Sequence, residues 1–106
     1  MAKYLLRASY TAEGARGLLK DGGTKRKAMA EAATKAIGGS MESFYYAFGE
    51  SDAIVIADVP DAVAATALSV AINASGAVKV AMTPLISVEE MDEACNRQVG
   101  YRPPGS

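Results

Sequence analysis

The side chains that could carry chemistry in this chain are few, and histidine is not among them. The 106 residues include no histidine and a single cysteine, Cys95. This composition removes histidine-based acid–base catalysis, the common zinc-ligand sets and any disulfide within the chain. No group of acidic residues has the spacing of a calcium loop. We therefore expect no metal and no cofactor, and any proton transfer would depend on tyrosine, arginine or aspartate.

Three polar side chains are expected to converge on one face of a sheet, namely Arg7, Tyr45 and Lys79. Unpaired cations are costly to bury between two sheets. They must therefore meet acids of a second copy, such as Glu42 or Asp58, or an anionic ligand, or water. This convergence is the favoured candidate for a ligand-binding site.

Two further candidates stand at the ends of predicted strands. Tyr10 could supply a hydroxyl at the mouth of a cavity. Asp52 closes the turn Gly49-Glu50-Ser51-Asp52 and could act as a general base there. The structural alternative, which we favour, is turn chemistry: Gly49 takes a positive φ and Asp52 accepts hydrogen bonds from neighbouring backbone amides.

The elements that must position these residues follow from the apolar pattern and the turn signals. Strands are predicted over 3–10, 41–48 and 53–59 and from Val78 to Pro84; helices are predicted over 12–37 with a break near Gly22 and Gly23, over 61–75, and after Ser87. This order predicts an α+β, ferredoxin-like βαββαβ fold with an extra C-terminal helix. Residues 1–98 are expected to form one domain with a four-stranded antiparallel sheet, and 99–106 a flexible tail.

The strand over 53–57, Ala-Ile-Val-Ile-Ala, is apolar at every position. An antiparallel sheet with one face in water would alternate apolar and polar residues, so both faces are expected to be buried. Helices cover one face, and the same face of a second copy is the simplest cover for the other, which predicts a homodimer or higher oligomer. The alternative is that the C-terminal helix folds across the open face.

Alternation along the strands assigns each side chain to one of the two faces of the sheet. A register error of one residue in any strand would exchange the two sets for that strand. The helix-facing set is expected to be Tyr4, Leu6, Ala8, Phe44, Tyr46, Phe48, Ile54, Ile56, Val78, Val80 and Met82. The opposite set is expected to be Leu5, Arg7, Ser9, Ser43, Tyr45, Val55, Lys79, Ala81 and Thr83.

Charge and hydropathy exclude several classes of partner. Eleven basic and twelve acidic residues nearly balance, so no field favours nucleic acid or an anionic membrane. Residues 1–6 enter a strand pattern directly, without the apolar core of a signal peptide, and no stretch approaches membrane length. We expect a cytoplasmic protein.

Across residues 3–95 the chain resembles the GYD domain family, small bacterial proteins of largely unassigned function in the dimeric α+β barrel group. The resemblance rests on the Tyr4 strand, Tyr10-Thr11 followed by Gly14, Arg26 in the long helix, Gly38-Gly39, and Phe44-Tyr45 before the turn. The naming motif, Gly-x-Tyr-Asp, stands here as Gly49-Glu50-Ser51-Asp52, with Ser51 at the tyrosine position. The resemblance implies a dimeric α+β barrel.

Three functions are compatible with these features, and whether the protein is an enzyme stays open. The first is an oligomeric binding or sensing module that holds a small anionic or aromatic molecule between sheets. The second is a cofactor-independent oxygenase or isomerase of the barrel group, which the absence of histidine disfavours. The third is a structural assembly unit.

Overall fold

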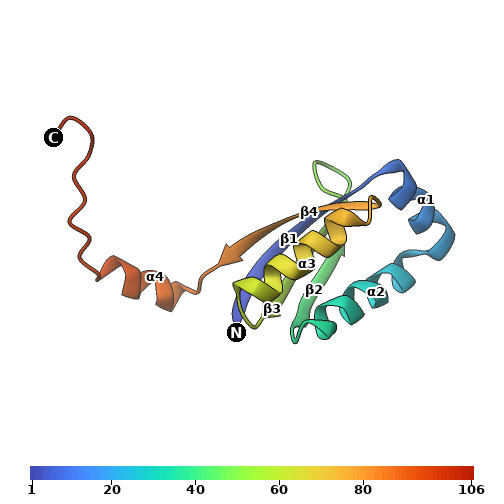
Figure 1. The fold of residues 1–106 in the computed structure, drawn as a ribbon, viewed down its shortest axis with the longest axis horizontal. Coiled ribbons are helices and arrows are strands. Elements are labelled where there is room, and N and C mark those ends of the chain that lie inside the picture. The colour runs from blue at the N-terminus through green and yellow to red at the C-terminus, as the bar shows by residue number, and fades with distance from the viewer.

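The computed structural model describes all 106 residues, and its chain alternates strands and helices in the predicted order (Figure 1). The elements are β1 (Ala2–Tyr10), α1 (Ala12–Asp21), α2 (Gly23–Ala36), β2 (Ser40–Tyr46), β3 (Ala53–Val59), α3 (Ala62–Ala74), β4 (Val78–Leu85) and α4 (Val88–Cys95). The four strands form one antiparallel sheet in the order β2-β3-β1-β4. The predicted α+β fold with a four-stranded antiparallel sheet is confirmed.

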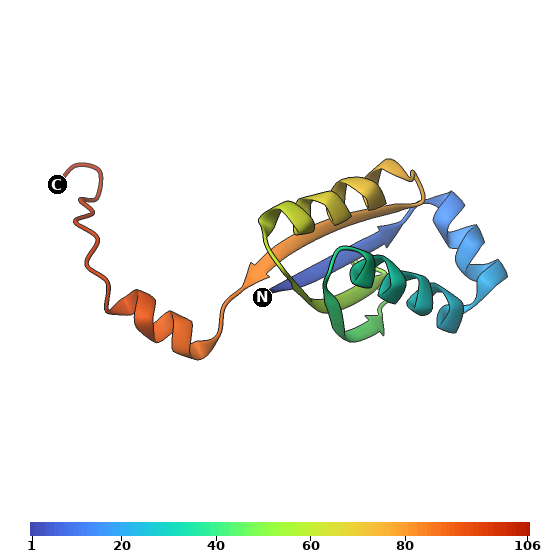
Figure 2. The same cartoon turned by 60° about the horizontal axis from the view of Figure 1, so that its bottom comes forward.

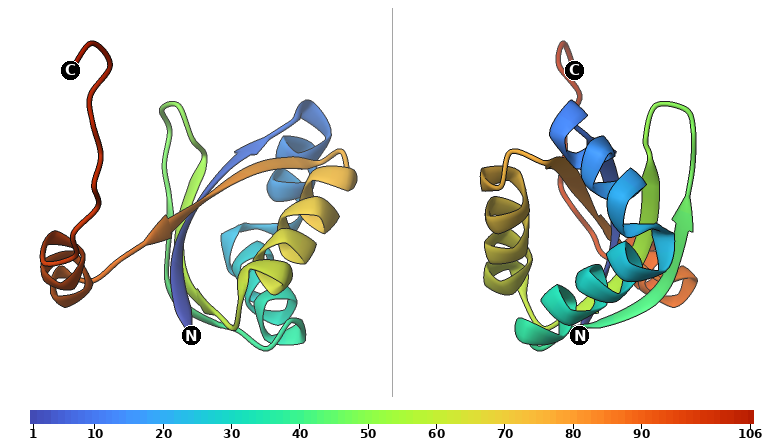
Figure 3. Two further views of the ribbon diagram at one scale, coloured as in Figure 1. Left: turned by 60° about the vertical axis from the view of Figure 1, so that its left-hand side comes forward. Right: turned by 90° about the vertical axis from the view of Figure 1, so that its right-hand side faces the viewer.

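Helices α1, α2 and α3 lie on one side of the sheet, which leaves the other side uncovered (Figures 2 and 3). Helix α2 packs on β2 and α3 packs on β4, so the two long helices lie over the outer strands. The middle strands, β3 and β1, face the space between these helices. We call the uncovered side the open face. None of the helices is both long enough and apolar enough to cross a membrane.

The helix boundaries follow the capping residues in the sequence. The Thr11 hydroxyl accepts a hydrogen bond from the Gly14 N–H, and the Asp61 carboxylate accepts one from the Ala64 N–H. Gly22, with φ of 83°, separates α1 from α2 at the predicted break.

Gly14 fixes α1 tightly to the start of β4. A Cβ at this position would lie 1.9 Å from the carbonyl oxygen of Ala77. The same carbonyl accepts a hydrogen bond from the Thr11 N–H at 3.0 Å. Because only glycine allows this approach, the spacing from Thr11 to Gly14 determines how the first helix leaves the sheet.

The side chains of β3 point to the opposite sides of the sheet from those predicted. Ala53, Val55, Ala57 and Val59 are buried beneath the helices, whereas Ile54 and Ile56 point to the open face. The prediction was wrong because the apolar run gives no polar side from which to read the register. The alanines and valines face the helices, and the two isoleucines make the open face more apolar than expected.

The length of β2 also differs from the prediction, whereas β4 ends one residue beyond its predicted end at Pro84. Strand β2 ends at Tyr46, and Phe48 lies fully exposed in the turn, so its assignment to the helix-facing set is wrong. A register shift between Met41 and Ser43 places Glu42 in a bulge. Strand β4 runs through Pro84 to Leu85, which is tolerated because β4 is an edge strand.

The C-terminal helix does not cover the open face of its own sheet. Helix α4 and residues 96–106, which form no helix or strand, project from the end of β4 (Figures 1 and 2). The Cα radius of gyration is 16.8 Å, whereas a compact domain of this length would have about 13 Å. The alternative in which α4 folds across the sheet is therefore wrong for this structure.

Candidate functional site

A cavity of about 370 Å³ opens between α2, α3 and the helix-covered face of the sheet. Eighteen residues line it, and fifteen of them are hydrophobic. Leu6 and Val55 lie at its floor on the middle strands, while Met29 of α2 and Ile72 of α3 lie on its walls. The volume falls within the range of small-molecule sites, which are mostly apolar with a few placed polar groups.

Alanine at the wall positions leaves this space open. Ala30 and Ala33 line it from α2, Ala71 from α3, and Ala8 and Ala53 from the sheet. These side chains are too short to fill the space that larger side chains fill in a closed core. The alanine content of the helices thus produces a cavity rather than a closer helix pair.

Tyr10 and Arg26 lie at the end of the cavity where β1 stops and α2 begins, whereas Thr34 lies near the C-terminal end of α2. The hydroxyls of Thr34 and Ser75 already donate to the backbone carbonyls of Ala30 and Ile72. Tyr10 and Arg26 also line the cavity, and the Tyr10 side chain neighbours that of Tyr46. They are the groups left to meet a ligand.

The Arg26 guanidinium is only weakly compensated. Its side chain is 22% exposed, and its one ion pair, with the Asp21 carboxylate, is 4.0 Å long. Beside it, the Tyr46 hydroxyl donates to the carbonyl of Gly23 at 2.8 Å. Burial, reinforced by neighbouring Tyr10, raises the pKa of Tyr46, so this tyrosine stays neutral. The site therefore presents one cation and neutral hydroxyls, a set suited to an anion or a hydrogen-bond acceptor.

Arg7, Tyr45 and Lys79 all lie on the open face, away from this cavity. Arg7 and Tyr45 both pair with Ile54, from opposite sides, so one isoleucine separates them. Lys79 pairs with Ser9, one row further along β1. Neither Arg7 nor Lys79 forms a salt bridge within the chain. The structure thus places the three residues on one face, spread over several strands.

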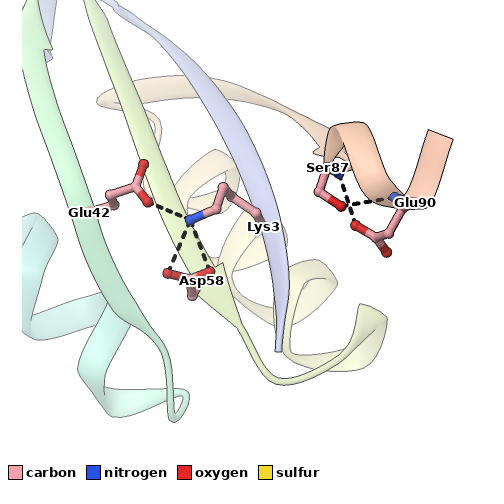
Figure 4. Close-up of polar contacts among 5 residues, drawn as sticks. All are labelled: Lys3, Glu42, Asp58, Ser87 and Glu90. Atoms are coloured by element: carbon pink, nitrogen blue, oxygen red, sulfur yellow. Dashed lines mark hydrogen bonds and ion pairs between the residues drawn. The ribbon is translucent and has the colours of Figure 1, made fainter. Parts of the chain in front are cut away.

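The acids of the open face are engaged by another cation. Lys3 pairs with Glu42 and with Asp58, the latter at 3.3 Å (Figure 4). The hydrogen bonds from Lys3 to Glu42 and then to Asp58 raise the pKa of Lys3. Both acids that could meet Arg7 or Lys79 across a dimer are therefore occupied within their own chain.

Asp52 fastens the β2–β3 hairpin to the end of β1. Its carboxylate accepts a hydrogen bond from the Tyr10 N–H at 2.8 Å, and its own N–H donates to the Ala8 carbonyl at 2.8 Å. Asp52 thus has a structural role, but its carboxylate bonds the N–H of Tyr10 on β1 and not the neighbouring amides of its own turn that were expected. The positive φ expected at Gly49 is absent, since the glycines with positive φ are Gly22, Gly38, Gly76 and Gly105.

Arg26 lines the cavity but was not among the predicted site residues, and Tyr46, which bonds to Gly23 nearby, does not line it. A signal was present: Arg26 stands three, four and seven residues before Met29, Ala30 and Ala33, in register with the apolar stripe of α2. A lone cation on an apolar stripe is the pattern that could have found it.

The fold and cavity define an α+β protein with a half-covered antiparallel sheet and a ligand-sized apolar cavity. A comparison with protein families matches the GYD domain over residues 4–95. The chain belongs to the GYD domain family, as the resemblance indicated. No curated protein and no solved structure matches it. The family identity supports the fold and assigns no activity, because one fold hosts many functions.

Proposed function

We propose that this protein is an oligomeric small-molecule-binding module whose ligand occupies the cavity between α2, α3 and the sheet. One observation carries the proposal: a ligand-sized apolar cavity that has a weakly paired arginine at its polar end. The ligand class is a molecule with an apolar body and an anionic head, which places its apolar part among the alanines and its head at Arg26.

The oligomer in this proposal pairs through the open face. Leu5, Ile54 and Ile56 form an apolar strip on it, with Ala81 on β4 beyond Arg7, and no helix of the chain covers them. A second copy applied by a two-fold axis would bury this strip on both sides. Pairing in this way leaves the cavity of each copy accessible on its outer side.

Calorimetric titration with decanoate tests the cavity. Decanoate has an apolar chain and one carboxylate, and Arg26→Gln removes the cation that would bind it. We expect Arg26→Gln to weaken binding about ten- to hundred-fold, because a hydrogen bond to a charged group contributes about 1.5–3 kcal/mol.

Lys27→Gln is the matched control, since Lys27 is the exposed neighbour of Arg26 and does not line the cavity. Ala33→Leu keeps every charge and fills the cavity, so it should abolish binding, whereas the exposed Ala32→Leu should not. Equal affinities for wild type, Arg26→Gln and Ala33→Leu would refute the proposed cavity.

A second candidate site lies on the open face, at Arg7 and Lys79. It is favoured by the absence of any salt bridge to either cation. An anion held there would lie between the sheets of two paired copies and neutralise both cations. Loss of decanoate binding in Arg7→Ala and Lys79→Ala, with Arg26→Gln unaffected, would select this site instead.

A further inference from the structure

Residues 86–101, which we call the C-terminal arm, expose more apolar side chains than a solvated tail requires. Their exposures range from 50% to 75%, and the residues are Ile86, Val88, Met91, Val99 and Tyr101. Val88, Met91 and Cys95 stand at helical spacing on one side of α4. The arm therefore presents an apolar stripe that nothing in its own chain covers.

The sequence nevertheless specifies α4 as a helix. Ser87 and Glu90 form a reciprocal capping box, in which the Ser87 hydroxyl accepts from the Glu90 N–H and the Glu90 carboxylate accepts from the Ser87 N–H (Figure 4). A helix of eight residues is marginal in water on its own, since isolated helices shorter than about 12–15 residues gain too little from propagation. The capped start and the apolar stripe of α4 point to a helix that is stabilised by packing against another surface.

The position of α4 selects the partner. Strand β4 carries the arm out of the domain, and α4 lies on the side of the sheet opposite to α1, α2 and α3 (Figure 3, left). This is the side on which a second copy would stack. A copy placed there would meet the arm, whereas the helix-covered side of the same chain is out of its reach.

Charge supports the same partner. Four of the eight residues of α4 are acids and none is basic. The open face of a second copy carries Arg7 and Lys79, neither of which has an acidic partner within its chain. When the open faces pair, Arg7 on the middle strand β1 is covered, whereas Lys79 lies on the edge strand β4, where the acids of an arm from the other copy would meet it.

We propose that the C-terminal arm is exchanged between two copies, so that the apolar stripe of α4 docks on the partner molecule. The arms then clasp the pair formed through the open faces, and the dimer gains area beyond the two sheets. This proposal rests on the pairing put forward above, and it adds a second, separable contact.

The single cysteine supplies a direct test, because Cys95 is exposed and lies on α4. A benzophenone maleimide attached at Cys95 in the full chain should, on irradiation at micromolar concentration, give a covalent dimer on a denaturing gel. A protein that sedimentation shows to be a dimer, but that cross-links only within one chain, would overturn the arm exchange and leave the pairing intact. A monomer by sedimentation would overturn both.

The dimer dissociation constant gives a second measurement. Val88→Gln combined with Met91→Gln makes the stripe polar without changing charge, and both side chains are exposed in the free chain, so folding is preserved. We expect the constant to rise at least about tenfold, because two apolar side chains lose their burial. Ala94→Gln combined with Asn96→Gln, off the stripe, should leave it within about threefold. Equal constants for the two double variants would contradict the exchange.

Discussion

At the scale of single residues, the structure divides the predicted site residues into two groups with different surroundings. Arg7, Tyr45 and Lys79 lie on the open face, as alternation along β1, β2 and β4 indicated. Tyr10 lines the cavity on the opposite side of the sheet. The two groups cannot contact one ligand, so the protein offers either a cavity site or an interface site.

Asp52 is expected to act on stability rather than on chemistry. Asp52→Ala removes the acceptor of the Tyr10 N–H and should lower the free energy of unfolding by about 1–3 kcal/mol, the range for leaving a buried donor unsatisfied. Urea unfolding measures this change. Asp52→Asn, which keeps an acceptor oxygen, should lose much less, and Glu50→Ala is the exposed control. An Asp52→Ala variant as stable as wild type would contradict the structural role.

Glu90 gives the arm a dependence on pH. The hydrogen bond from the Ser87 backbone holds the pKa of Glu90 below its usual 4.5. A lowered pKa in the folded state stabilises α4 above the unfolded value, and this contribution is lost as pH falls through the folded pKa. Amide chemical shifts of 88–95 should therefore show α4 fraying as the pH falls below 4.5 and through the lowered pKa of Glu90. Ser87→Ala should fray already at neutral pH; unchanged shifts from pH 7 to pH 3 would refute the capping argument.

At the scale of elements, local signals in the sequence predicted the order of the helices and strands. The main error was the assignment of the β3 side chains to the two faces of the sheet. Caps at Thr11 and Asp61 and the break at Gly22 marked helix boundaries correctly, because each acts within a few residues. The facing of β3 depends on tertiary packing, since Ala-Ile-Val-Ile-Ala is apolar on both faces. The cavity was likewise beyond the sequence, because it depends on how far apart α2 and α3 lie.

The contact between α1 and β4 can be tested with a matched pair of glycines. Gly14→Ala places a methyl group against the Ala77 carbonyl, a backbone atom that cannot move aside, and should destabilise the protein by about 1–3 kcal/mol. Gly17→Ala lies in the same helix with no atom within 4 Å, and should stabilise it by about 0.5–1 kcal/mol. Thermal unfolding measures both, and shifts of the same sign would contradict the packing of α1.

At the scale of the whole molecule, the open face and the projecting arm both support the proposal that the protein pairs with a second copy. The uncovered sheet carries Leu5, Ile54 and Ile56, and the arm adds a further apolar stripe. The sequence predicted the partner of the sheet from the apolar run over 53–57. The sequence offered no prediction for a partner of the arm, because an apolar stripe on a helix does not identify the molecule against which it packs.

Pairing through the open face makes a prediction about oligomeric state. Ile56→Asp should convert the dimer to a monomer at tens of micromolar, since it would bury two unpaired carboxylates at the two-fold interface. Analytical ultracentrifugation measures the change. Val63→Asp introduces the same charge at a residue 79% exposed on α3, and should leave the dimer intact. Persistence of the dimer in Ile56→Asp would place the interface elsewhere.

The most direct measurement is an NMR experiment that locates bound decanoate. In protein with labelled methyl groups, the chain of decanoate should give intermolecular nuclear Overhauser effects to the methyl groups of Ala30, Ala33 and Ala71, which line the cavity from α2 and α3. Effects confined to Leu5, Ile54 and Ala81 would place the ligand on the open face. That result would contradict the cavity as the binding site.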